Sequence, residues 1–141
     1  MNVSRLATVF SLIGAAFILY IGISYLITPE TIATGFGLPA WPEGDAVAFM
    51  NLKGVRDTVS GILILVLLAT KQRYALGITT LVIALIPLGD MLTVFSWDGS
   101  AATALGIHGL TAVFVALTGG LLIRESRTAP APARVPAPIA A

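Results

Sequence analysis

The sequence contains no cysteine and only one histidine, His108, among its 141 residues. The absence of cysteine excludes disulfide bonds, thiol redox chemistry and metal sites built from thiolates. One histidine is too few for the paired axial ligands of a membrane cytochrome b or for an ordinary zinc site. The nucleotide-binding motif G-x-x-x-x-G-K-[ST] is also missing. We therefore expect neither a metal site nor a cofactor.

Charge is scarce as well. Charged residues make up only 11% of the chain, and the formal net charge is +1. Soluble domains carry about 25% charged residues, and surfaces that bind nucleic acid are strongly basic. With 57% apolar residues, the composition excludes a soluble α/β enzyme, a nucleic-acid-binding module and a disordered chain. It is typical of a protein whose surroundings are the lipid bilayer.

The chain is instead rich in long apolar runs. A hydrocarbon core of about 30 Å needs roughly 20 helical residues to cross it. The first run exceeds the roughly 7–15 apolar residues of a signal peptide, so we expect it to remain uncleaved. Lipid forces each crossing segment to satisfy its own backbone hydrogen bonds. We therefore predict an all-α, four-transmembrane-helix bundle over residues 1–127, with spans at 6–27, 48–68, 74–95 and 101–123.

The charges that flank these runs predict an orientation. Positive residues lie at one set of span ends and acidic residues at the other, and the positive side faces the cytoplasm. Both termini are therefore expected in the cytoplasm, in a multi-pass protein of a bacterial inner (plasma) membrane. The charges are Arg5, Lys71, Arg73, Arg124, Arg127 and Arg134 on the inner side, and Glu30, Glu43, Asp45 and Asp98 on the outer side.

Three shorter segments carry local signals. Thr28-Pro29-Glu30 resembles a helix start, with threonine as the cap and proline at the first position. We expect a short interfacial helix in this first outer loop. Ala112, Ala116 and Gly120 recur on one face of the fourth span, which favours close helix packing there. Residues 128–141 are mostly alanine and proline, which is typical of a disordered tail.

Ionisable side chains inside the spans are costly and therefore informative. Counting inward at about 1.5 Å per residue places five of them roughly 8–14 Å below the outer surface. On the second span, Lys53, Arg56, Asp57 and Ser60 share one helical face. The sequence thus predicts an outward-opening polar pocket. The five side chains are Tyr20, Arg56, Asp57, Asp90 and His108.

The predicted pocket suits acid–base chemistry on a small lipophilic substrate. Asp57 and Asp90 form a candidate acid and base pair, with Arg56 holding one of them ionised. His108 would relay a proton or stabilise an oxyanion. Double-bond isomerisation, cyclisation and epoxide opening all fit, as reactions of an isomerase, cyclase or hydrolase. The candidate substrate-binding residues are Tyr20, Lys53, Ser60, Thr111 and Trp97.

Other interpretations stay open. Arg56 with Asp90, or Lys53 with Asp57, could pair only to fix helix register, as in a structural or accessory subunit. A proton-coupled transporter, acting as a homodimer because four helices enclose little volume, is the other alternative. The inner half of the bundle has almost no charge, which disfavours a path across the membrane.

Several short elements along the chain carry a family resemblance. They are Pro29-Glu30, Phe36-Gly37-Leu38-Pro39, Gly54-Val55-Arg56-Asp57, Gly61, Asp90 and His108. In these elements the chain resembles a family of small four-helix membrane proteins catalogued as domain of unknown function 4267. The resemblance covers nearly all of the chain except the tail, and it implies the four-helix fold but no reaction. The small multidrug exporters of similar size depend on a glutamate in the first span, and this chain has no carboxylate there.

Overall fold

The computed structural model describes residues 2–128, and within them every regular element is a helix. The predicted all-α class is therefore confirmed. The predicted tail lies outside the described residues, except for Thr128, which ends the last helix. The elements are α1 (Val3–Ile27), α2 (Pro29–Ala33), the 3-10 helix η1 (Gly44–Val47), α3 (Ala48–Ala69), α4 (Arg73–Ile83), α5 (Leu85–Ser96), α6 (Ala101–Thr103), the π-helical turn η2 (Ala104–Gly109) and α7 (Leu110–Thr128).

Four long helical rods make up most of this structure, at the places of the four predicted spans. They are α1, α3, the pair α4–α5, and the continuous stretch α6–η2–α7. Three of them, Val3–Ile27, Arg73–Ser96 and Ala101–Thr128, are long and apolar enough to cross a membrane. The rod α3 has 22 residues, but its first half carries Lys53 and the Arg56-Asp57 pair. Its crossing stays a prediction.

Two rods contain an irregularity. The third rod breaks between Ile83 and Leu85, one turn before Pro87. Proline has no amide hydrogen to donate and its ring crowds the preceding turn, so the backbone bends away there. The fourth rod contains the π-helical turn η2, which was not predicted. A π turn holds an extra residue and often occurs beside functional sites.

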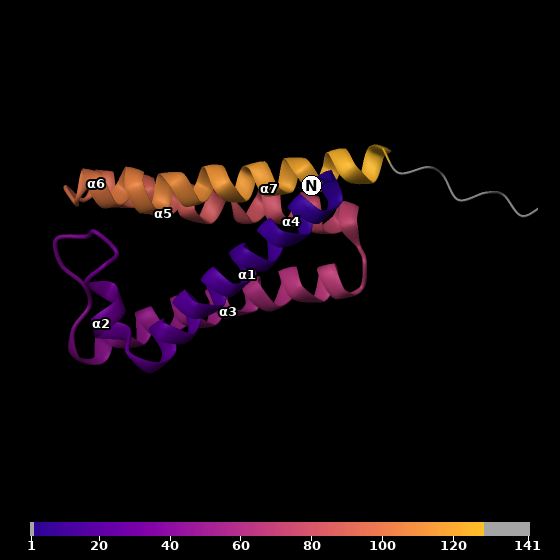
Figure 1. Cartoon of the computed structure of the whole chain (residues 1–141). Helices are drawn as coiled ribbons and strands as arrows, with labels where there is room; N and C mark the ends of the chain where they lie inside the picture. Colours follow the sequence, from indigo (N-terminus) through magenta and orange to yellow (C-terminus); the bar gives the residue numbers. More distant parts are fainter. Residues whose placement is uncertain (1, 129–141) are drawn as a thin grey trace, which may run out of the picture.

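The rods form two pairs that diverge from one end of the molecule (Figure 1). The rod α1 packs along α3, and α4–α5 packs along η2 and α7. The pairs meet where α1 contacts α7 and α3 contacts α4. The start of α1 and the end of α7 lie at this meeting end, whereas α2 and α6 lie at the other, wider end.

Glycines bring the rods of each pair into close contact. A Cβ atom added to Gly22 of α1 would lie 2.6 Å from the Thr58 amide nitrogen of α3. In the second pair, a Cβ atom on Gly119 would lie 3.0 Å from the Gly77 carbonyl oxygen. Such small-residue contacts let helices approach closely. The predicted small-residue face of the fourth span was wrong by one position, because a Cβ atom on Gly120 would meet nothing within 4 Å.

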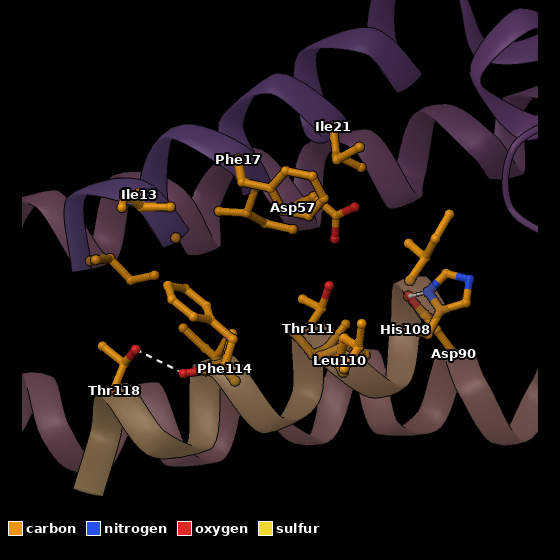
Figure 2. A pocket seen from close by; sticks show the side chains of 18 of the residues that line it. Ile13, Phe17, Ile21, Asp57, Asp90, His108, Leu110, Thr111, Phe114 and Thr118 are labelled. Carbon is orange, nitrogen blue, oxygen red and sulfur yellow. Dashed lines mark hydrogen bonds and ion pairs between the residues drawn. The ribbon is translucent and has the colours of Figure 1, made fainter. Parts of the chain in front are cut away.

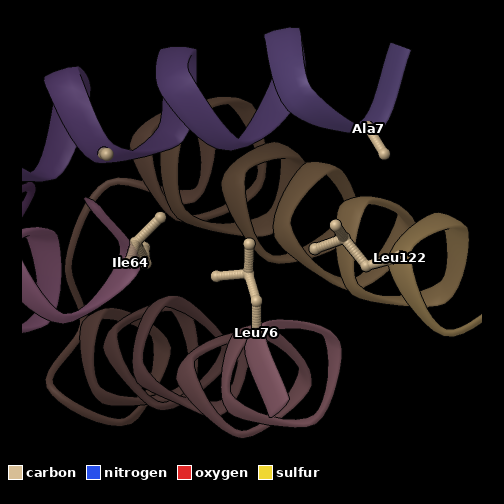
Figure 3. Packing of buried hydrophobic residues seen from close by; sticks show 5 residues of the cluster. Ala7, Ile64, Leu76 and Leu122 are labelled. Atoms are coloured by element: carbon tan, nitrogen blue, oxygen red, sulfur yellow. The ribbon is translucent and has the colours of Figure 1, made fainter. Parts of the chain in front are cut away.

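The meeting end of the two pairs is closed by apolar packing and by one arginine. Figure 3 shows the cluster of Ala7, Ile64, Leu76 and Leu122, to which Ala15 also belongs. The Arg73 guanidinium donates to the Glu125 carboxylate, to the Thr8 hydroxyl at 3.1 Å and to the Ser4 carbonyl at 3.2 Å. One side chain of α4 thereby joins α1 and α7.

The wider end is covered by the connection between α1 and α3. The predicted short helix is present as α2, with Pro29 at its first turn. Thr28 is the N-cap residue, as predicted, but its hydroxyl makes no capping hydrogen bond and donates to the Ser24 carbonyl at 3.3 Å instead. Further along, Gly37 adopts a φ of 98°, a conformation that favours glycine. Its carbonyl accepts the Ser100 amide at 2.8 Å, which ties the connection to the second pair.

Candidate functional site

A cavity of about 690 Å³ lies between the two helix pairs. Aromatic and aliphatic side chains line most of it, and the ionisable groups are confined to one end. Figure 2 shows Asp57, Asp90 and His108 toward that end, with Thr118 toward the other. The lining is thus more apolar than the predicted polar pocket. The apolar lining includes Phe10, Ile13, Phe17, Ile18, Ile21, Phe36, Ile83, Ile86, Phe114 and Val115.

Lys53 is the centre of the charged end. Its ammonium lies 2.8 Å from Oδ2 of Asp57, one helical turn further along α3, and 3.7 Å from Oδ2 of Asp90 on α5. It also lies over the rings of Tyr25 and Phe36, 5.2 and 5.5 Å from their centroids. Aromatic faces attract cations. The lysine is therefore held between two carboxylates and two aromatic rings.

Asp57 needs this partner because it is only 2% exposed. A carboxylate without a partner is very costly in an apolar interior. The same α3 face brings Gly54 and Gly61 against α1, one turn before and one turn after Asp57. The close approach of α1 is what keeps solvent from this carboxylate. Asp90 is less enclosed, with 27% of its side chain exposed.

His108 connects the charged end to the connection that covers it. Its Nε2 lies 2.8 Å from the Phe36 carbonyl oxygen, and its ring lies 4.6 Å from the Phe36 ring, centroid to centroid. A carbonyl only accepts, so Nε2 carries a hydrogen. The other nitrogen, Nδ1, lies 4.0 Å from Oδ2 of Asp90. His108 therefore presents either a free nitrogen lone pair or a second N–H to this carboxylate.

The structure brings together five of the nine predicted site residues. Asp57, Asp90, His108, Lys53 and Thr111 all line the cavity. The possible pair of Lys53 with Asp57 is formed. Whether these residues act in catalysis or binding stays a prediction.

The other four predicted residues do not reach the cavity. Arg56 is exposed, and its place beside Asp90 is taken by Lys53. Ser60 donates to the Arg56 carbonyl at 2.9 Å. Tyr20 and Trp97 are 62% and 68% exposed. The Arg56 and Tyr20 side chains therefore do not line the cavity.

Tyr25, Phe36 and Thr80 line the cavity without having been predicted as site residues. Tyr25 lies three residues after Gly22, so on a helical wheel the two residues share the face of α1 that packs against α3. Tyr20 lies on another face of the same helix. Phe36 belongs to the element Phe36-Gly37-Leu38-Pro39, which lies outside the predicted spans. Among residues 2–128 no group of three or more His, Cys, Asp or Glu side chains is placed to hold a metal ion.

Comparison with known proteins gives one match. The family model described as Domain of unknown function (DUF4267) matches residues 15–122 of the chain. The chain belongs to the DUF4267 family. The match spans most of α1 through most of α7, so it includes every residue of the charged end. No curated protein and no solved structure is significantly similar to this DUF4267 chain.

Proposed function

We propose that this DUF4267 protein crosses a membrane with four helices, with both termini on the cytoplasmic side, and performs acid–base chemistry on a small lipophilic molecule. One observation carries the proposal. Two carboxylates, a lysine and a histidine form a chain of contacts at one end of an apolar cavity, in which Asp57 contacts Lys53, Lys53 contacts Asp90, and Asp90 contacts His108, each within 4.0 Å.

The charge balance of this end supports a mobile proton. Two carboxylates and one ammonium leave a net charge of −1 when His108 is neutral. A net charge is expensive in an apolar site, and one proton held between Asp90 and His108 removes it. That proton has two nearby bases, so it can leave for a substrate and be replaced. Asp57, which accepts a hydrogen bond from the Lys53 ammonium at 2.8 Å, is the candidate acceptor.

This arrangement fits reactions in which a proton enters at one atom and leaves from another. In a double-bond isomerisation, Asp57 would remove a proton from one carbon of the substrate while the Asp90–His108 pair donates a proton to another carbon. The proton on Asp57 would then return to Asp90 through the Lys53 ammonium that lies between the two carboxylates, which restores the site. Cyclisation begins with the same protonation, and epoxide opening adds water. The aromatic and aliphatic lining excludes bulk water and holds a lipophilic substrate by burial of apolar surface.

Transport is less well supported than catalysis. A transporter must open its site to each side of the membrane in turn. The meeting end of the helix pairs is closed by the Arg73 contacts and by the apolar cluster around Leu76. The predicted homodimer stays a prediction.

The test uses isotopes, so that the substrate need not be known beforehand. The purified full chain is incubated in D₂O and H₂¹⁸O with lipophilic metabolites extracted from its own organism. Mass spectrometry then looks for new deuterium or ¹⁸O. We expect labelling with the wild-type protein and with the control variant Arg56→Gln, which removes one charge from an exposed residue that does not line the cavity. With Asp57→Asn or Asp90→Asn we expect at least about 100-fold less labelling. Absence of labelling above the no-protein control would refute the catalytic proposal.

A further inference from the structure

The other end of the cavity contains a hydroxyl group without a partner. Among the described residues, Thr80 Oγ1 is the one buried side-chain polar atom that makes no hydrogen bond. The residue is 4% exposed and lines the cavity. Buried polar groups nearly always have a hydrogen-bond partner. This hydroxyl therefore points to something that the cavity holds.

Two other hydroxyl side chains along the cavity, those of Ser11 and Thr118, do not share this property. The Ser11 hydroxyl donates to the Ala7 carbonyl at 2.8 Å, and the Thr118 hydroxyl donates to the Phe114 carbonyl at 2.8 Å (Figure 2). Both use the carbonyl one turn earlier in their own helix, which is the usual local solution. Thr80 does not use it, so its hydroxyl is free to bond outside its helix.

The position of Thr80 sets the distance between this hydroxyl and the charged end of the cavity. It lies ten residues before Asp90 on the kinked α4–α5 rod, which at about 1.5 Å per residue corresponds to about 15 Å. On the facing rod, His108 and Thr118 are also ten residues apart. Between these levels the lining of the α4–α5 rod consists of Ile83, Ile86 and Pro87. The α4–α5 side of the cavity thus has a polar group at each end and an apolar middle.

We propose that Thr80 forms a second polar subsite, and that the molecule bound here is an elongated lipophile with a polar group at each end. One group lies at Lys53, Asp90 and His108, and a hydroxyl or carbonyl oxygen at the other end pairs with Thr80 Oγ1. This inference rests on the proposed function, because it assigns the substrate class of the same cavity. A saturated chain extends about 1.25 Å per carbon, from bonds of about 1.5 Å at about 111°. The two groups are therefore separated by about twelve carbons.

Two matched probes test the subsite. Dodecan-1-ol and dodecane-1,12-diol differ only in the second hydroxyl, and their binding to the full chain in detergent micelles is measured by calorimetry, with empty micelles subtracted. One additional hydrogen bond corresponds to an affinity gain of about three- to tenfold. Thr80→Val keeps the side-chain shape and removes the unpaired hydroxyl, so the fold is retained. Thr79→Val is the matched control, because Thr79 does not line the cavity.

We expect the ratio of diol to alcohol affinity to be about three- to tenfold higher in the wild-type protein and Thr79→Val than in Thr80→Val. The comparison between variants cancels the different partition of the two probes into micelles. If both probes bind and the ratio is the same in all three proteins, the subsite is refuted and the proposed function stands. If neither probe binds the wild-type protein, the cavity does not hold elongated alcohols, and the inference fails independently of the labelling experiment.

Discussion

The lysine at the charged end offers the sharpest test of how the site is held together. Lys53→Met keeps most of the side-chain length and removes the ammonium. Asp57, which is 2% exposed, would then lose its only ion-pair partner among the described residues. Asp90 would lose the same cation at 3.7 Å. The substitution thus leaves a buried negative charge without compensation.

The expected cost follows from this geometry. Removing one member of a fully buried ion pair costs about 3–5 kcal/mol. The Lys53 side chain is 27% exposed, so solvent screens part of the interaction, and we expect a loss of about 2–4 kcal/mol in the free energy of unfolding. Arg56→Met removes the same charge three residues away on an exposed position. Its expected effect lies within about 0.5 kcal/mol.

The measurement is reversible unfolding of each variant in mixed micelles, followed by circular dichroism. The double variant Lys53→Met with Asp57→Asn replaces the stranded carboxylate by a neutral amide. It should be more stable than Lys53→Met alone by about 1–2 kcal/mol, as expected for residues in direct contact. Equal losses for Lys53→Met and Arg56→Met, or no recovery in the double variant, would refute the assignment of Lys53 as the central cation.

Two further predictions concern packing. Gly22→Ala should lower the free energy of unfolding by about 1–3 kcal/mol, because the new methyl group would meet the Thr58 amide at 2.6 Å. Gly120→Ala meets nothing and should be neutral or slightly stabilising; the same unfolding assay compares them. Arg73→Gln should destabilise the meeting end, because Glu125 loses its partner. Faster hydrogen exchange of the first turns of α1, with unchanged exchange around Gly22, would check this.

The positions of the rods were predictable because a membrane helix must be both long and apolar. The predicted span 101–123 thus begins at the same residue as the helical stretch Ala101–Thr128, which continues for five more residues. The face by which each helix packs against its neighbours was harder to predict. Lipid is as apolar as leucine, so an apolar side chain can point toward the lipid or toward another helix. The small-residue face around Gly120 was therefore placed one residue away from Gly119, which packs against Gly77.

For the site, too, the position of a residue along its helix was easier to predict than the direction in which its side chain points around the helix. Counting residues identified the level at which Asp57, Asp90 and His108 lie, and the structure places all three around one cavity. It did not distinguish Arg56 from Lys53, since both share the polar half of the helix. Only the approach of α1 decides which cation is enclosed. Phe36 was out of reach for another reason: its backbone carbonyl, a group that every residue possesses, contacts His108.

That contact affects which sequence changes the protein can accept. The wider end is fastened by the carbonyl oxygens of residues 36 and 37, which bind His108 and the Ser100 amide. A point mutation cannot delete a carbonyl, so these two hydrogen bonds depend on the path of the backbone, which at Gly37 requires a φ of 98°. Inserting or deleting a residue between α2 and Phe36 would instead shift both oxygens along the chain. Natural variants should therefore differ in composition across this loop far more readily than in its length.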